Sequence, residues 1–303
     1  MRKFLLITTL LIMGIGLEAQ QDPHYSQYMF NGLVLNPAVA GNLAHLNATL
    51  IAREQWVGIP GRPRTQSLAV DGPSRNRKHG FGGVIVNDVS GIMHDFRLSG
   101  SYAYRLHLSK NATLSMGLQL SVNNIRSDFT QLYVDDPTDA SISANTVNFW
   151  AFNTGAGLYF QNKMIFAGFS VPEILENNGA ENPYVFRQDR NYLMTAGVIL
   201  KAGPQVKIRP STLIKFNPNV PMQADLNVMA VLKDKYWFGA SYRTSDAAVL
   251  ITQWQINPQW RIGYAYDITL SSLKQRSSGS HEIVLNFELN YEKESQVNPR
   301  FFR

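Results

Sequence analysis

Apolar and polar residues alternate with a period of two along most of this chain, and this alternation is its dominant pattern. It is clearest in residues 113–123, 207–217 and 281–292, where one set of alternate positions is largely apolar and the other largely polar. In the second of these stretches, Leu213 is the exception, because it falls among the polar positions. Successive side chains of a β-strand point to opposite faces, so the pattern predicts strands with one apolar and one polar face.

The alternation and its interruptions divide the chain into fourteen candidate strands. They are expected at residues 47–54, 66–71, 80–87, 94–107, 112–123, 147–160, 164–170, 191–202, 206–216, 222–232, 236–243, 247–255, 259–267 and 281–292. An even number of antiparallel strands is typical of bacterial outer-membrane barrels. A tilted strand needs about 9 to 11 residues to cross a bilayer, and most of these segments have that length.

The lengths of the connections between strands support a membrane barrel independently. Outer-membrane barrels have short turns on the periplasmic side and longer loops on the outside. Counted from a periplasmic N-terminus, the even-numbered connections are 72–79, 108–111, 161–163, 203–205, 233–235 and 256–258, all but the first of which are three or four residues long. The odd-numbered connections include the long segments 55–65, 124–146, 171–190 and 268–280.

A soluble β-sandwich would also show alternation, so the choice between sandwich and barrel depends on other features. Aromatic residues recur near the predicted strand ends, as in the interfacial girdles of membrane barrels: Tyr102, Tyr104, Trp150, Phe160, Tyr236, Tyr242, Trp260 and Tyr291. A soluble sandwich gives no reason for short and long connections to alternate along the chain. We therefore predict an all-β fold, a transmembrane antiparallel β-barrel of about 14 strands with an N-terminal periplasmic or lumen segment.

The first twenty residues differ in kind from the rest. Arg2 and Lys3 precede an apolar run from Phe4 to Leu17, and small residues follow it before the sequence becomes polar. This is the pattern of a secretory signal peptide, and the run is short for a transmembrane helix. We expect cleavage near Ala19 or Gln20. The predicted organisation is a signal peptide at 1–20, a lead-in segment at 21–46 and a barrel at 47–303.

The lead-in segment is too apolar to be a free polar tail. We expect it to pack against the periplasmic mouth of the barrel or to enter the lumen; the alternative is an ordered lead-in without a role of its own. Residues in it and near the C-terminus are candidates for contact with a periplasmic partner: Tyr25, Tyr28, Phe30, Asn36, Pro37, Pro299, Arg300 and Phe301.

Composition and motifs argue against several classes of function. The net charge of +6 is spread along the chain, which does not suggest a nucleic-acid surface. Cysteine is absent, and the six histidines have no spacing typical of metal ligands, so we expect neither metal nor cofactor. Ser280 and His281 would point to opposite faces of a strand, and the glycines at 80–83 precede no helix, so neither group predicts an enzyme.

The polar face of the predicted strands carries ionisable residues. The residues expected to line the lumen are Arg97, Arg105, Lys207, Arg209, Lys215, Arg243, Arg261, Glu282 and Glu288, accompanied by Asp225, Asp267 and Glu292. Ionisable residues at membrane depth usually face a wet or paired interior. Two interpretations remain open: a pore or peptide-binding lumen, or an internal salt-bridge network that fills the barrel.

Several stretches resemble one known family. They are QDPHYSQYMFNGLVLNPAVAG (residues 21–41), REQWVGIPGRPRTQSLAVDGP (53–73), NDVSG (87–91), SYAYRLHLS (101–109), FAGFSVPEIL (166–175), YWFGASYR (236–243), IGYAYDITLSSL (262–273), GSHEIVL (279–285) and NPRFF (298–302). In this order they resemble the PorP/SprF family of Bacteroidetes outer-membrane proteins across essentially the whole mature chain. The chain departs from that pattern at Val39, where an aromatic residue is expected.

The resemblance implies a setting in type IX secretion and gliding motility. Members are barrels associated with secretion of surface proteins, often large adhesins, and are thought to receive or retain cargo bearing a type B C-terminal sorting domain. Periplasmic components of the same machinery are implied partners, and no catalytic residues are implied. We therefore expect an integral protein of the cell outer membrane that handles or anchors cargo, with connections 124–146 and 171–190 as cargo contacts. The alternative is a passive channel for small solutes.

Overall fold

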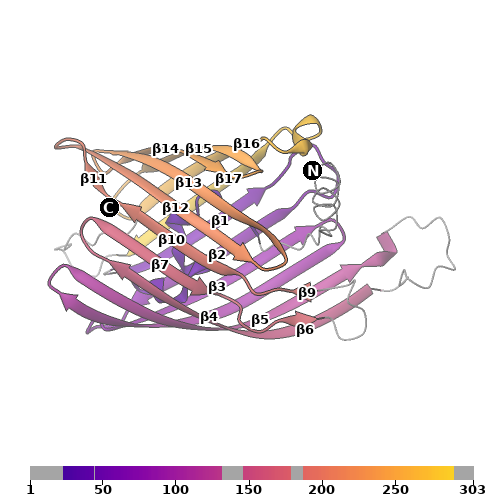
Figure 1. Ribbon diagram of the computed structural model, residues 1–303, viewed down its shortest axis with the longest axis horizontal. Helices are drawn as coiled ribbons and strands as arrows, with labels where there is room; N and C mark the ends of the chain where they lie inside the picture. The colour runs from indigo at the N-terminus through magenta and orange to yellow at the C-terminus, as the bar shows by residue number, and fades with distance from the viewer. Residues whose placement is uncertain (1–22, 44, 132–145, 179–186, 290–303) are drawn as a thin grey trace, which may run out of the picture.

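The computed structural model describes residues 23–43, 45–131, 146–178 and 187–289. Fourteen antiparallel strands form one closed cylinder, in which each strand pairs with its neighbours in sequence and β1 pairs with β17 (Figure 1). The strands are β1 (Leu46–Glu54), β2 (Arg64–Pro73), β3 (His79–Ser90), β4 (Met93–Ser109), β5 (Ala112–Asp128), β6 (Thr146–Gln161), β7 (Ile165–Val171), β10 (Tyr192–Val198), β12 (Val206–Asn217), β13 (Val220–Leu232), β14 (Tyr236–Arg243), β15 (Ala247–Gln255), β16 (Trp260–Thr269) and β17 (Ser280–Leu289). The predicted barrel is thus confirmed.

Three short additional strands lie beside this cylinder. β11 (Leu200–Lys201) continues β10 after a break at Ile199 and pairs with β12, so the predicted strand 191–202 is two strands. β8 (Asn177–Asn178) and β9 (Arg187–Gln188) pair with each other outside the barrel sheet. The predicted residues 290–292 of the last strand, and Glu292 with them, lie outside the described residues.

The alternation read from the sequence separates the two faces of the wall. On β5, Leu118 and Leu120 are 63% and 73% exposed and point away from the barrel, whereas Gln119 between them is buried. On β6, Phe152 is 72% exposed and Asn153 is buried. Apolar side chains therefore cover the outside, as a lipid environment requires. Leu213, the exception in the pattern, is buried on the inner face.

The wall is much taller on one side than on the other. β4 and β5 have 17 residues each and β6 has 16, but β7 and β10 have only 7 each. Figure 1 shows β5 and β6 extending beyond their neighbours at one end of the barrel. This is the end with the longer connections, which we call the outer end; the end with the short turns, where β1 begins and β17 finishes, is the periplasmic end.

The N-terminal segment before β1 lies inside the barrel. We call residues 23–45 the lumen segment. It contains η1 (Tyr28–Phe30), α2 (Gly32–Leu35) and η2 (Pro37–Val39), and side chains of all three are buried. The other short helices, η3 (Phe129–Gln131) and η4 (Ser272–Gln275), belong to outer connections. None of the helices in the described part of the chain is long and apolar enough to cross a membrane.

The core of the protein is the interface between lumen segment and wall. Tyr25, Tyr28, Met29 and Phe30 pack in one cluster with inward-facing wall residues, among them Trp237. A second cluster joins Leu33 and Ala40 to Ala69, Val84, Val86 and Ala103 of the wall. A lumen with a packed segment explains why the inner face carries apolar residues as well as ionisable ones.

Candidate functional site

The lumen segment runs from the outer half of the barrel to the periplasmic end, and its contacts trace this route. Ser26 bonds to residues near the outer ends of β16 and β17, where its hydroxyl lies 2.7 Å from Asp267 Oδ1. Asn36 lies closer to the periplasmic end, where its amide donates to Leu158 O of β6 at 3.0 Å. Asn42 and Gln161 exchange two hydrogen bonds of 2.7 Å at the periplasmic end of β6. The segment therefore contacts the wall at every level.

The outer part of the segment is held by buried charges, which we call the polar anchor (Ser26, Gln27, Arg53, Arg243, Asp267 and Glu282). The Ser26 and Gln27 amides donate to the two Glu282 oxygens at 2.8 and 2.7 Å. Arg53 joins the carboxylates, with 2.7 Å from Nη2 to Asp267 and 3.3 Å from Nη1 to Glu282. All of these side chains are buried, so the two carboxylates depend on buried guanidinium groups for charge compensation.

Arg243 extends the polar anchor around the wall. It lies 3.2 Å from Asp225 and 3.3 Å from Asp267. Asp246, in the β14–β15 turn, lies 3.2 Å from the same guanidinium. The anchor therefore links β1, β13, β14, β16 and β17 to the start of the lumen segment.

The middle of the segment is aromatic. The Tyr28 hydroxyl accepts a hydrogen bond from the Asn227 amide, and burial raises the pKa of Tyr28, which therefore stays protonated. The Arg261 guanidinium lies 5.3 Å from the ring centres of both Phe30 and Trp237, a distance at which cation–π attraction operates.

The part of the segment nearer the periplasmic end, which we call its inner part, packs against glycines of the wall. We call this region the glycine contact (Asn36–Ala40 with Gly80, Gly117 and Gly157). A Cβ added at Gly117 would overlap the backbone of Pro37 and Ala38, and one at Gly80 would overlap the Ala40 carbonyl. Only glycine allows two backbones to approach so closely. Asn36 fixes the turn here, because its Oδ1 accepts from the Ala38 amide at 2.9 Å as an N-cap of η2.

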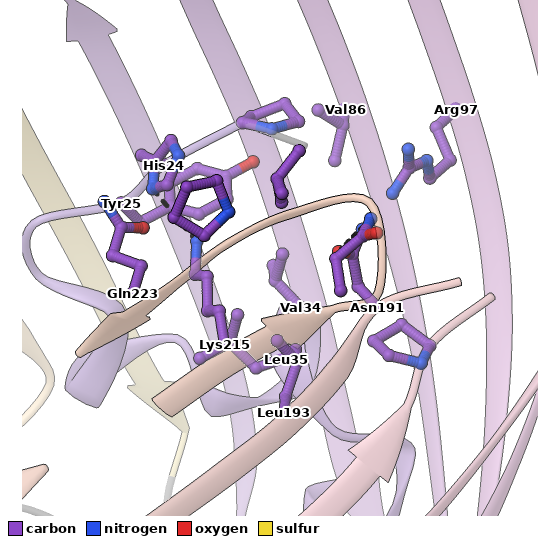
Figure 2. Close-up of a pocket in the computed structure, with 15 residues that line it drawn as sticks. His24, Tyr25, Val34, Leu35, Val86, Arg97, Asn191, Leu193, Lys215 and Gln223 are labelled. Carbon is purple, nitrogen blue, oxygen red and sulfur yellow. Dashed lines mark hydrogen bonds between the residues drawn. The ribbon is translucent and has the colours of Figure 1, made fainter. Parts of the chain in front are cut away.

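A cavity lies between the lumen segment and the low part of the wall at the outer end. We call it the outer chamber. It is lined by lumen-segment residues and by the outer ends of β10, β12 and β13, with Val34, Leu35 and Leu193 among its apolar residues. Figure 2 shows Lys215 extending toward His24, with Arg97 on the far side of the chamber. Lys215 Nζ is 3.0 Å from His24 Nδ1.

The histidine of the outer chamber is kept neutral by its surroundings. Burial lowers the pKa of His24 well below its usual range, and the charges of Lys215, Arg243 and Arg53 lower it further. Neutral His24 can accept a hydrogen bond from the Lys215 ammonium through Nδ1. The chamber thus combines an apolar lining with a few polar groups, as ligand sites commonly do.

A comparison with protein families decides what this barrel is. The model for the "Type IX secretion system membrane protein PorP/SprF" matches residues 17–287. The chain belongs to the PorP/SprF family. The resemblance found in the sequence is therefore confirmed over the lumen segment and all but the end of the barrel. A search of curated proteins returned no match.

Solved structures resemble this PorP/SprF barrel in fold. One is the toluene transporter TbuX of Ralstonia pickettii, with 10% identity, coverage of 86% of this chain and 93% of that one, and a TM-score of 0.51. Another is a TodX deletion mutant described as a monoaromatic hydrocarbon channel, also with 10% identity and a TM-score of 0.51, covering 86% of this chain and 94% of that one. At this identity the likeness shows a shared barrel fold alone.

Family and fold together make this chain an outer-membrane barrel of a secretion system. Its family consists of secretion components and its structural neighbours are channels and transporters, not enzymes. No group of three or more histidine, cysteine or acidic residues in the described parts of the chain is arranged to hold a metal ion.

The residues expected to line the lumen lie on the inner face at several levels. Arg97 bonds to Glu173 at 3.2 Å near the outer end, and Arg105 donates to Ala40 O at 2.7 Å near the periplasmic end. Arg209 is buried, and Glu288 bonds to His45 at 3.0 Å and Arg261 at 3.4 Å. Arg243 and Glu282 belong to the polar anchor and Lys215 to the outer chamber. Lys207 differs, because it pairs with exposed Asp234 at a periplasmic turn.

These contacts favour the internal network over the open pore. The inward charges bond to one another or to the lumen segment, which occupies the space that a pore would need. A peptide-binding role for the lumen would first require that this segment move.

The structure places the expected partner-contact residues of the lumen segment against the barrel wall. Tyr25, Tyr28, Phe30, Asn36 and Pro37 are buried there, and their contact with a periplasmic partner stays a prediction. Their apolar surface is buried within the same chain. The other partner candidates, Pro299, Arg300 and Phe301, lie outside the described residues.

Some of the most important residues carry a weak signal in the sequence. Arg53 and Ser26 make central contacts of the polar anchor, but neither belongs to a local motif that would mark it as part of a site. Arg53 does fall on the inward alternation of β1 with Ile51 and Thr49, which could have identified it. Gly80, Gly117 and Gly157 occupy inward positions that admit no side chain, and their pattern could have indicated a segment packed against them.

Proposed function

We propose that this barrel handles or anchors secreted surface proteins at the outer face of the outer membrane, as part of type IX secretion and gliding motility. The cargo class inferred from the family carries a type B C-terminal sorting domain. The observation that carries the proposal is the lumen segment: it is held by buried charges at one end and by backbone contact at the other. A barrel whose own chain occupies its lumen is suited to binding at its mouth rather than to free passage.

The outer end offers the surfaces for such binding. The tall strands β5 and β6 are joined by the connection 129–145, and residues 172–191 connect β7 to β10. That second connection is tied to β6, since Asn153 Nδ2 donates to Leu175 O at 2.8 Å and the Ile174 amide donates to Thr154 O at 2.8 Å. The start of this connection, which lines the outer chamber with Pro172, is therefore held against β6.

Deletion of the outer connection tests the proposal. β5 extends to Asp128, beyond its predicted end, so the replaceable part of the expected 124–146 connection is residues 132–145, which lie outside the described residues. Replacing 132–145 by a short Gly-Ser linker should abolish surface retention of cargo, measured by labelling of intact cells, while barrel insertion stays normal. The control shortens the η4 connection by the same method. Normal retention after the first replacement would remove the role of this connection.

The alternative is a passive channel for small solutes. The barrel fold shared with hydrocarbon channels is compatible with it, although a likeness of 10% identity transfers no substrate. Planar-bilayer recording of the purified barrel separates the two functions: we expect little or no steady conductance. Steady conductance with unchanged cargo retention in the 132–145 replacement would favour the channel.

A further inference from the structure

The periplasmic end of the barrel carries a positive surface that neither the lumen nor the outer chamber explains. Its cations are on consecutive short turns and the strand ends beside them. All are exposed: Arg75 and Lys78 between β2 and β3, Lys110 between β4 and β5, Lys163 between β6 and β7, Lys201 on β11, and Lys233 and Lys235 between β13 and β14. We call this group the basic rim.

The basic rim has almost no matching negative charge among the described residues. Asp234 is the exposed carboxylate of these turns, and it lies 2.5 Å from Lys207 of the wall. The other carboxylates at this end, Asp71 and Glu288, are buried inside the barrel. None of the basic-rim side chains has an ion pair in the described structure.

The outer end is different, because the exposed carboxylates Glu54 and Glu176 lie among its cations. Arg62 lies 2.9 Å from Glu54, and Arg64 lies 3.7 Å from the same carboxylate. Arg190 lies 3.9 Å from Glu176. Charge at the outer end is thus mixed in sign, although Arg126, Lys274 and Arg276 are also exposed there. The periplasmic end instead carries a one-sign field that extends about 8 to 10 Å into the solvent at ordinary salt.

The basic rim is an arc and not a ring. The turn between β15 and β16, with Asn257, Pro258 and Gln259, carries no charged residue. Lipid headgroups surround a barrel on all sides, and a surface selected for them would have no reason to omit one turn. A protein that docks across the mouth, centred away from the β15–β16 turn, would meet the other five turns and leave that one free.

We propose that the basic rim is the docking surface for the acidic face of a periplasmic component of the secretion machinery. The inference rests on the proposed function, because membership of the family supplies the class of partner. Complementary charge would steer that component to the mouth and fix its orientation, and the contact would weaken as salt rises.

Zero-length carbodiimide cross-linking of native outer membranes tests the proposal, because the reagent joins a lysine ammonium to a carboxylate in direct contact. Mass spectrometry of the linked peptides should find Lys110, Lys163 or Lys235 joined to aspartate or glutamate of a periplasmic protein. The matched control is Lys274, an exposed lysine of η4 at the opposite end, which should yield no link to that protein.

A charge-reversal variant provides the second arm. Lys110→Glu, Lys163→Glu and Lys235→Glu together should lower co-purification of the cross-linked component about tenfold or more, since like charges then face each other. Lys274→Glu should leave it unchanged. The three positions are exposed turns, and heat-modifiable migration on gels would verify that the variant barrel folds.

Two results would overturn the inference. One is cross-linking and co-purification that are equal in the variant and the native barrel. The other is the absence of protein links together with loss of co-purified anionic phospholipid in the variant, which would assign the basic rim to lipid. In either case, cargo retention that still depends on residues 132–145 would leave the proposed function standing, so the two failures are distinguishable.

Discussion

The two ends of the lumen segment are attached to the same barrel by different physics. At the polar anchor, charged side chains from distant strands converge on Ser26 and Gln27. At the glycine contact, the wall offers no side chain, and the backbone of Pro37 and Ala38 lies directly against it. The first attachment depends mainly on charge balance. The second depends mainly on shape, although Arg105 donates to Ala40 O and Asp71 accepts from the Gly41 amide beside it.

This difference indicates which end would release first. Contacts between charged groups respond to pH and to a competing ligand, whereas close backbone packing changes only if the wall itself moves. The polar anchor also lies beside the outer chamber, where an external partner would arrive. We therefore expect any conformational change of the lumen segment to begin at its outer end, and the following variants test this order.

Replacement of Arg53 should have the largest effect on the attachment of the lumen segment. Arg53→Met removes the cation that Asp267 and Glu282 share. Glu282 is then buried without a guanidinium partner, while Asp267 keeps Arg243 at 3.3 Å. Removal of one member of a buried ion pair typically costs about 3 to 5 kcal/mol. We expect conductance steps to appear in planar bilayers, because the outer end of the segment detaches. Arg62→Met, which breaks an exposed pair with Glu54, should change stability by about 1 kcal/mol or less and produce no conductance.

A side chain at the glycine contact should have the next largest effect. Gly117→Val places methyl groups where the Pro37–Ala38 backbone lies, and overpacking of this kind costs about 1 to 3 kcal/mol. Hydrogen exchange measured by mass spectrometry should speed up in residues 36–42 first. Gly100→Val is the matched control, because a Cβ there meets nothing within 4 Å. Equal exchange in both variants would show that the inner attachment does not depend on shape.

The sequence predicts the wall of this protein far better than its interior. Alternation identifies all fourteen strands because the lipid face demands an apolar residue at every second position, as at Leu118 and Leu120. The inner face follows no such rule, since it accepts apolar Leu213 in the core cluster and polar Gln119 on β5. The pairing of Arg53 with Asp267 joins residues 214 positions apart, and no local pattern specifies that contact.

The cap of η2 should have an intermediate effect on the inner attachment. Asn36→Ala removes the acceptor for the Ala38 amide and the donor to Leu158 O. Loss of an N-cap side chain costs about 0.5 to 2 kcal/mol. The urea midpoint of unfolding should fall accordingly, whereas Asn111→Ala at an exposed turn should leave it unchanged. A midpoint unaffected by Asn36→Ala would mean that the glycine contact alone holds this part of the segment.

Acidification should produce the smallest and most selective effect, confined to the outer end. The pKa of His24 is lowered in the folded protein by burial and by Lys215, Arg243 and Arg53. The folded state therefore binds fewer protons than the unfolded state, so stability is present above the unfolded pKa of about 6.5 and is lost as the pH falls below it. The slope for one such group reaches at most about 1.4 kcal/mol per pH unit.

The expected readout is faster hydrogen exchange in residues 24–30 at pH 5.5 than at pH 7.5, after correction for the intrinsic pH dependence of exchange. His24→Gln removes the titrating ring and should abolish the difference, while residues 36–42 of the same molecule serve as an internal control. Acid sensitivity that is equal at both ends would contradict the division between a charge-dependent and a shape-dependent attachment. Sensitivity at the outer end alone would place the release point of the lumen segment beside the outer chamber, where cargo contact is proposed.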